Sequence, residues 1–250
     1  MNQTPTTAVL LAAGRGQRLR PYTDHTPKPL LPVNGRPTLD YVLTAAQQAG
    51  IKNIILVTHH LAEQIEQYVA DGAAWGLTAV CCRQPEMLGT AHALQTAVTA
   101  YPHLFEEELP FLLTATDYIL PPTYLADLTA AHQQNGADIT ISLKELPLAD
   151  IIGRSCVKFE ENGHGRGRGR IVRIIEKPIA NEIDNPFTAS LTFILPGVTL
   201  DYLGRVRPSP RGELEIQDAI NQMIAAGLTA GGLVQPTPRE WTLETDAPRG

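Results

Sequence analysis

The sequence predicts an α/β fold in which helices cover both faces of a largely parallel sheet. Short apolar runs alternate with segments of helical periodicity along most of the 250 residues, which is the pattern of repeated strand–helix units. The chain is long enough to bury a sizeable core, and neither an internal repeat nor a long linker divides it. We therefore expect a single domain over residues 1–250, with halves at about 1–145 and about 146–250.

The first half has the more regular alternation. Its apolar runs predict strands, the segments between them predict helices, and Gly50 ends the first of these helices. Ligands in such sheets bind beyond the carboxyl ends of the strands, where Gly14 and Asp117 would both lie. The expected strands are 8–11, 53–58, 78–83, 111–115 and 138–143, and the expected helices are 37–49, 61–70, 90–100 and 122–135.

The second half changes character. Two expected strands, 156–160 and 171–175, are joined by a glycine- and arginine-rich segment at 162–169. This segment is more typical of a solvated hairpin tip than of a ligand-binding loop. The other expected elements are strands at 188–195, 233–237 and 241–245 and a helix at 213–226.

Composition and charge disfavour several classes of protein. A net charge of −6 argues against a nucleic-acid surface, and no stretch approaches the roughly 20 apolar residues of a membrane span. The N-terminus lacks the basic region of a signal peptide, so the cytoplasm is the expected compartment. Three cysteines cannot form a disulfide framework, and the adjacent Cys81 and Cys82 are expected to pack as small hydrophobes along a strand.

The strand at 8–11 opens directly into a glycine-rich loop. Gly14 and Gly16 would let the backbone turn tightly and leave N–H groups free to face an anion, and we expect a helix that follows to add its positive end. Arg18 and Lys28 would place two fixed cations near the same point, which suits a triphosphate. The loop alone is weak evidence for a triphosphate site, because it has neither the ending of a P-loop nor the third glycine of a dinucleotide fingerprint.

The complete string is far more specific. L-A-A-G-x-G-x-R-L-x-P followed by P-K-P-L-L-P-V resembles the opening of the sugar-1-phosphate nucleotidyltransferases. The resemblance implies a Rossmann-like three-layer α/β/α fold with a mixed, mostly parallel sheet, of the nucleotide-diphospho-sugar transferase type. It implies that Arg18 and Lys28 act in catalysis. The nucleotide-binding residues that it implies in this loop are Leu11, Ala12, Ala13, Gly14 and Gly16.

The implied reaction is attack of a sugar 1-phosphate oxygen on the α-phosphorus of a nucleoside triphosphate, with release of pyrophosphate. Because the nucleophile is already an anion, catalysis consists of neutralising charge and holding the reactants in line. The resemblance implies Mg²⁺ as the cofactor. Asp117 stands where the family places a metal-binding aspartate, although Thr116 replaces the glycine that usually precedes it. Asp246 is the preferred second metal ligand, with Glu244 as the alternative.

Segment 83–91 resembles the family's segment that reads a pyrimidine, which favours UTP or dTTP. A glutamine side chain can donate and accept, so Gln84 would pair with the N3–H and O4 edge of uracil or thymine. Gly89 would let the backbone approach the ring. Thr90 is assigned to the nucleotide site and is also expected to cap the helix that follows it.

The run I-I-E-K-P at 174–178 matches the E-K-P motif of the family. Glu176 would accept hydrogen bonds from sugar hydroxyls, and Lys177 would bind the sugar's phosphate as a point charge in a catalytic role. Gly153 and Thr188 are assigned to sugar binding. Thr188 stands where the family often has asparagine, so the particular sugar stays open.

The remaining polar residues are expected to be structural. Asp218 would act in helix packing. The histidines show no metal spacing joined to carboxylates, so surface or helix-packing positions are expected for His59, His60, His92 and His132.

Two alternative functions stay open. The phosphate loop would also suit a cytidylyltransferase for a non-sugar phosphate such as phosphocholine, although Gln84 and the Glu176-Lys177 pair favour a sugar. The substitutions at Thr116, Thr188, Ser190 and Ala247 leave room for a non-catalytic regulatory module that binds a nucleotide sugar. The expected partners are a nucleoside triphosphate and a sugar 1-phosphate, with no nucleic acid, no membrane and a homo-oligomer as an option.

Overall fold

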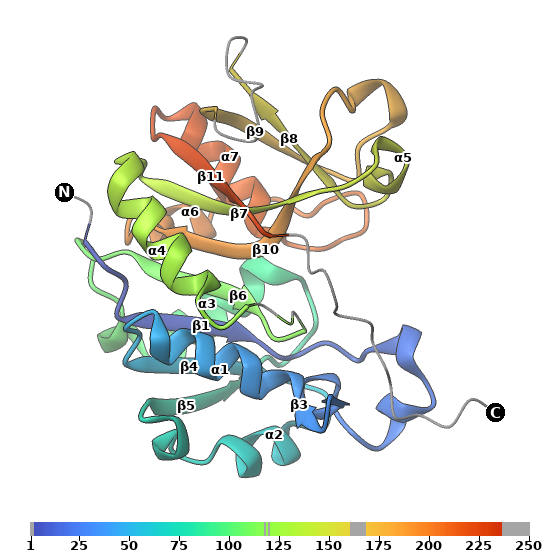
Figure 1. Ribbon diagram of the computed structural model, residues 1–250, viewed down its shortest axis with the longest axis vertical. Coiled ribbons are helices and arrows are strands. Elements are labelled where there is room, and N and C mark those ends of the chain that lie inside the picture. The colour runs from blue at the N-terminus through green and yellow to red at the C-terminus, as the bar shows by residue number, and fades with distance from the viewer. Residues whose placement is uncertain (1–2, 118, 120, 161–168, 237–250) are drawn as a thin grey trace.

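A nine-stranded sheet runs through the molecule from one end to the other (Figure 1). The computed structural model describes residues 3–117, 119, 121–160 and 169–236. The strand order is β5-β4-β1-β6-β10-β7-β11-β9-β8, and a separate small hairpin pairs β2 with β3. The strands are β1 (Thr7–Leu11), β2 (Pro32–Val33), β3 (Arg36–Pro37), β4 (Asn53–Thr58), β5 (Thr78–Arg83), β6 (Phe111–Ala115), β7 (Ile139–Glu145), β8 (Ser155–Phe159), β9 (Ile171–Glu176), β10 (Phe187–Leu195) and β11 (Ala230–Val234).

Most strands of this sheet run in one direction. β5, β4, β1 and β6 are parallel neighbours, and β11 is parallel to β7. β10 is antiparallel to both β6 and β7 and therefore joins the two halves of the sheet. β9 is antiparallel to both β11 and β8. The sheet is thus mixed and mostly parallel, as the sequence predicts.

Helices cover both faces and complete the three layers. The helices on one face are α1 (Thr38–Gln48), α2 (Ala62–Val69) and α4 (Tyr124–Asn135). Those on the other face are α3 (Thr90–Ala100), α6 (Thr199–Leu203) and α7 (Ile216–Ala225), and the short α5 (Leu148–Ile151) follows β7. Within the part of the chain that the structure describes, no helix has the length and apolar character needed to cross a membrane.

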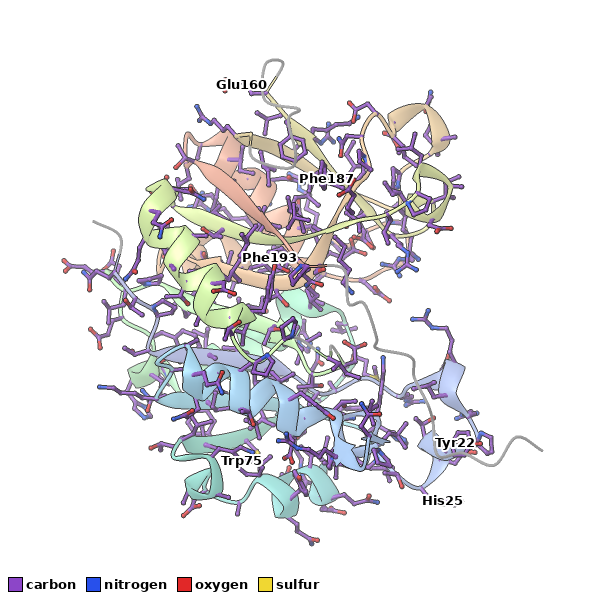
Figure 2. All side chains as sticks on the ribbon, in the orientation of Figure 1. Tyr22, His25, Trp75, Glu160, Phe187 and Phe193 are labelled. Atoms are coloured by element: carbon purple, nitrogen blue, oxygen red, sulfur yellow. The ribbon has the colours of Figure 1, made fainter. Side chains whose placement is uncertain are left out.

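Two apolar cores, one on each face, follow from the alternation of side chains along the strands. In β1, Val9 faces the core that α3 and α7 share, whereas Ala8 and Leu10 face the core that α1 and α4 share. Phe193 on β10 is also fully buried, and Figure 2 shows it near the middle of the molecule, between the two halves of the sheet. The continuous sheet therefore ties the two halves into one packed body.

The structure confirms most of the expected elements, with shifts at their ends. β4, β5, β6 and α3 have the expected bounds. β7 extends to Glu145 because it pairs with β10 that far. The helix expected at 213–226 begins only at Ile216, and the strand expected at 233–237 lies at Ala230–Val234. The strand expected at 241–245 lies outside the described residues.

The helix expected at 37–49, after the glycine-rich loop, is present as α1, so it does not start beside the glycines. Gln17–Leu19 forms only one 3₁₀ turn, and the first α-helix begins at Thr38. One turn carries little of a helix macrodipole. The 3₁₀ turn therefore adds little to the field of the loop's N–H groups and cationic side chains, whereas the start of α1 at Thr38 lines the same cleft as the loop.

The cysteines behave as the sequence predicts. Cys82 is buried and Cys81 is half-buried on β5, and both are free thiols. Burial raises the pKa of each to about 11. Both side chains therefore stay protonated near neutral pH and pack as small apolar groups.

Candidate active site

A cleft of about 1550 Å³ opens at the carboxyl ends of β1, β5, β6 and β7. This is the edge at which parallel α/β sheets bind ligands. The cleft brings together segments that are far apart in the sequence. The sequence-predicted residues that line it are Leu11, Ala12, Ala13, Gly14, Gly16, Arg18, Lys28, Gln84, Gly89, Thr90 and Asp117.

Both the backbone conformation and the surroundings of position 16 require glycine there. Its φ of 60° lies in the left-handed region, which side chains disfavour. A Cβ there would lie 2.7 Å from Cγ2 of Thr23, whose hydroxyl donates to the Gly16 carbonyl at 3.0 Å. Thr23 is itself buried. The loop is therefore held in one shape by a contact that only glycine permits.

The loop presents a row of free donors to the cleft wall. Among the described residues, the main-chain N–H groups from 13 to 18 have no hydrogen-bond partner. Arg15 and Arg18 are exposed at the cleft and make no ion pair with a described residue. Consecutive free N–H groups flanked by cations form an anion site, so this wall suits the phosphates of a ligand.

Asp117 and Lys28 form an ion pair on the cleft wall. Asp117 comes directly after β6, and Lys28 belongs to the loop that follows β1, so two neighbouring strands bring them together. Thr116 has no left-handed backbone and donates its hydroxyl to the Leu11 carbonyl at 3.1 Å. The threonine is thus accommodated in place of the usual glycine, and it anchors Asp117 to β1.

Gln84 is held by two hydrogen bonds on the nitrogen of its side-chain amide. The side chain is only 3% exposed. Its Nε2 donates to the Gly89 carbonyl at 3.2 Å and contacts Nδ1 of His92 at 2.9 Å. Both amide hydrogens are therefore used within the protein, which leaves Oε1 for a ligand. This arrangement does not support the expectation that Gln84 also donates to the base.

The segment that follows β5 is tied to the segment that precedes α7. Leu214 donates to the Leu88 carbonyl at 2.6 Å and accepts from Ala91 at 2.8 Å. Thr90 Oγ1 accepts from the main-chain N–H of Ile216 at 2.9 Å. The expectation that Thr90 caps α3 is therefore wrong, because its hydroxyl satisfies the first turn of α7 instead.

The contact with Leu214 also explains Gly89. Its φ is 112°, and a Cβ would lie 2.5 Å from the Leu214 carbonyl oxygen. Close approach of two backbones therefore requires glycine at this position. We call residues 84–91 and 213–216, joined in this way, the base–sugar clamp.

The sugar-side motif residues converge on a turn outside the cleft lining. Lys177 donates its main-chain N–H to the Arg154 carbonyl at 2.6 Å, next to Gly153. Gly153 has φ 79° with open space around it. Lys177 has φ 52°, which is uncommon for a residue with a side chain. The structure thus brings together Gly153 and the E-K-P motif, which the sequence predicts to act together.

Glu176 is half-buried beside an acidic cluster. Burial raises the pKa of its carboxyl to about 7, and the charge of Glu215 adds to this rise. Arg211 opposes it while pairing with Glu215 at 2.5 Å and Glu213 at 3.0 Å. Gln217 Nε2 donates to Glu176 Oε2 at 3.3 Å, and its buried Oε1 has no partner among the described residues.

Thr188 is buried on β10, where its hydroxyl contacts that of Ser155 at 3.2 Å. It does not line the cleft, so its assignment to sugar binding stays a prediction. Lys144, directly opposite Thr188 in the sheet, does line the cleft, and sequence reasoning missed it. Burial lowers the pKa of Lys144, and the charge of Asp117 opposes this change. Its place on the wall depends on the extension of β7, which the apolar pattern did not predict.

Other polar residues have structural partners. Asp218 accepts from the main-chain N–H of Arg207 at 3.0 Å, as a structural role predicts. His132 is buried against Thr140 at 2.9 Å. The described residues contain no group of three or more metal-ligating side chains. Asp246 and Glu244 lie outside the described residues, so the choice between them stays a prediction.

The fold and the cleft define an α/β protein with a large cleft at the carboxyl ends of its strands. A family model described as nucleotidyl transferase matches residues 7–239. The chain belongs to this family.

Two relatives come from Haloferax volcanii. A low-salt glycan biosynthesis nucleotidyltransferase is 30% identical over 220 residues, covering 88% of this chain and 57% of the relative. A UTP–glucose-1-phosphate uridylyltransferase is 31% identical over 223 residues, covering 89% of this chain and 85% of the relative. The chain spans only about half the length of several other relatives that it matches.

A solved structure has the same fold. UDP-glucose pyrophosphorylase complexed with UDP-glucose superposes with a TM-score of 0.77, covering 93% of this chain and 92% of that chain, at 21% sequence identity. At this level of identity the similarity establishes the three-layer fold.

Proposed function

We propose that this protein transfers a nucleotidyl group from a nucleoside triphosphate to a sugar 1-phosphate, giving a nucleotide sugar and pyrophosphate. One observation carries the proposal: a loop with free N–H groups, the Lys28–Asp117 pair and Gln84 all line one cleft. The relatives support the same class of reaction, because one is named as a UTP–glucose-1-phosphate uridylyltransferase.

In this reaction a phosphate oxygen of the sugar 1-phosphate attacks the α-phosphorus. A P–O bond forms there while the bond to the β-phosphate oxygen breaks, and pyrophosphate leaves. Arg18, Lys28 and the free N–H groups of the loop would offset the negative charge on the triphosphate. Lys177 would bind the phosphate of the incoming sugar. No general base is required, since the attacking oxygen is already an anion.

A divalent cation fits the chemistry of this wall. Asp117 presents a carboxylate that is about a third exposed at the cleft, next to the phosphate loop. Mg²⁺ is commonly held by one or two carboxylates together with substrate phosphates and water. We propose that Asp117 holds Mg²⁺ with Asp246, or with Glu244, and that the ion adds positive charge at the phosphates.

A pyrimidine with an N3–H group is the proposed base, as in UTP or dTTP. With both amide hydrogens of Gln84 occupied, its Oε1 is the atom available to accept from that N3–H. Cytosine has an acceptor at N3 instead. The side chain therefore favours uridylyl or thymidylyl transfer over cytidylyl transfer.

The direct test is a panel of sugar 1-phosphates against the four common triphosphates, read by pyrophosphate release with and without Mg²⁺. We expect turnover with UTP or dTTP and a sugar 1-phosphate, and loss of it in Arg18→Ala and Lys28→Ala proteins that keep the wild-type Tm. Turnover of CTP with phosphocholine alone would favour the non-sugar alternative. Nucleotide-sugar binding with no turnover would favour the regulatory module.

A further inference from the structure

The amide of Gln84 has two possible orientations, and its neighbours select one. A rotated amide would present donors to the cleft instead of the oxygen. The Gly89 carbonyl can only accept, so it requires the Nε2 side of the amide at 3.2 Å. The second hydrogen on Nε2 meets Nδ1 of His92 at 2.9 Å. This contact is a hydrogen bond only when Nδ1 is the acceptor, and the ring proton then lies on Nε2.

His92 is well placed for this task. It is the third residue of α3, whose start is tied to Leu214 through the main chain of Ala91. Its carbonyl accepts from Thr96 within the same helix. His92 does not line the cleft, so it reaches a ligand only through Gln84. The main chain of Gln84 is also fixed, because its N–H donates to the Thr58 carbonyl at 2.8 Å and its carbonyl contacts Nδ1 of His59 at 2.8 Å.

We propose that His92 is a positioning residue that keeps the Gln84 oxygen turned toward the base and so sets nucleotide specificity. The inference rests on the proposed function and goes beyond it, because it names the residue that makes a two-sided amide act as an acceptor only. Uracil and thymine carry a hydrogen at N3, which this oxygen accepts. Cytosine carries a lone pair at N3, which this oxygen repels.

The test compares two replacements of His92 that have different hydrogen-bonding capacity. His92→Leu removes the acceptor while keeping a branched side chain on the helix. His92→Asn supplies Oδ1 at the same position along the side chain as Nδ1. With its oxygen turned toward Nε2 of Gln84, the asparagine again gives that nitrogen two acceptors, its own Oδ1 and the Gly89 carbonyl, as in the wild-type protein. Thr96→Val, one helical turn further along α3, is the control for damage to the helix.

For each protein we would measure kcat and KM with UTP and CTP, KM for the sugar 1-phosphate, and Tm. We expect His92→Leu to lower the ratio of kcat/KM for UTP over CTP by about tenfold, as for one lost polar pairing. The change should fall mainly on KM for the nucleotide, with KM for the sugar 1-phosphate unchanged. His92→Asn should restore most of the ratio, and Thr96→Val should not alter it.

Two outcomes would overturn the proposal. An unchanged UTP-to-CTP ratio in folded His92→Leu would show that the histidine does not orient the amide. An equal loss with both nucleotides that asparagine fails to rescue would show a merely structural role. If His92→Leu does not fold, His92→Ala is measured in its place.

The failure of the proposed function would look different. It would appear as wild-type protein that releases no pyrophosphate with any pair of substrates. In that case calorimetric binding of UTP, N3-methyl-UTP and CTP to the wild-type and variant proteins tests His92 on its own. Wild-type protein should favour UTP over both analogues, and equal binding of the three would contradict the assignment.

Discussion

The nucleotide side and the sugar side of the cleft are built in different ways. On the nucleotide side, short segments that follow parallel strands carry the candidate residues, and all of those that lie in the described part of the chain line the cleft. On the sugar side, Gly153, Glu176 and Lys177 gather on a turn beside antiparallel strands, and none of them lines it. A residue at the end of a strand has its position set by the strand itself. The positions of the sugar-side residues depend instead on how segments distant in the sequence pair.

The base–sugar clamp is where these two sides meet. Leu214 and Ile216 bond to the segment that contains Gly89 and Thr90. Glu213 of the same segment lines the cleft, and the charge of Glu215 raises the pKa of Glu176. A change on the nucleotide side can therefore reach the sugar side through main-chain hydrogen bonds. The comparison between the two sides becomes testable by disturbing each of them separately and then the clamp itself.

The largest effect is expected from the nucleotide side. Asp117→Asn removes the carboxylate that pairs with Lys28 and that we assign to the metal. We expect kcat to fall by about 10³-fold, the size of a lost electrostatic contribution at developing charge, with Tm little changed because the side chain is partly exposed. Pyrophosphate release under saturating Mg²⁺ measures it. Activity within about threefold of wild type would remove Asp117 from the site.

Breaking the clamp should cost stability as well as activity. Gly89→Ala places a Cβ against the Leu214 carbonyl at a backbone conformation that alanine avoids. We expect about 2–3 kcal/mol of lost unfolding free energy from strain and displacement, measured by urea denaturation. Gly136→Ala is the matched control, because Gly136 has φ 62° and open space around it; about 1 kcal/mol is expected there. Equal losses in the two variants would mean that the Leu214 contact is not tight.

The sequence predicts the nucleotide side well because its signals are local. An apolar strand followed by glycine or aspartate fixes both the secondary structure and the edge at which the residue lies, as for Gly16 and Asp117. Local reasoning still erred where a segment has an unexpected partner. It expected Thr90 to cap its own helix, whereas the Thr90 hydroxyl bonds to α7.

The sugar side shows what sequence alone does not give. The cleft position of Lys144 depends on how far β7 pairs with β10, which is a tertiary property. The burial of Thr188 depends on Ser155, 33 residues earlier in the chain. Gln217 and His92 act on other side chains, Glu176 and Gln84, and the spacing of residues along the chain does not reveal such contacts.

The pH dependence of sugar binding separates the two sides further. With a pKa of about 7, the Glu176 carboxyl gains a proton as pH falls from 8 to 6 and becomes a weaker, uncharged acceptor for sugar hydroxyls. KM for the sugar 1-phosphate should therefore rise as pH falls through 7, by up to about tenfold per unit, while KM for the nucleotide changes less.

The matched variant for this pH dependence is Glu215→Gln. It removes a negative charge that raises the pKa of Glu176, so the rise in KM should move to lower pH. Comparing the two proteins cancels the titration of the substrate's own phosphate. Superimposable profiles would show that the charge of Glu215 does not raise the pKa of Glu176, and a KM that does not change with pH in either protein would show that Glu176 does not bind the sugar.

The smallest effect sharpens the comparison most, because it changes one hydrogen bond between the two sides. Thr90→Val keeps the branched shape but removes the oxygen that accepts from Ile216 at 2.9 Å. We expect a loss of about 1 kcal/mol in unfolding free energy, since an N–H in the first turn of α7 loses its partner. Thr99→Val is the control, because the Thr99 hydroxyl bonds only within α3, to the Gln95 carbonyl. If the clamp links the sites, Thr90→Val should raise KM for the nucleotide and for the sugar 1-phosphate together, whereas Thr99→Val should raise neither. A rise confined to the nucleotide would mean that the two sides are joined in structure but act independently.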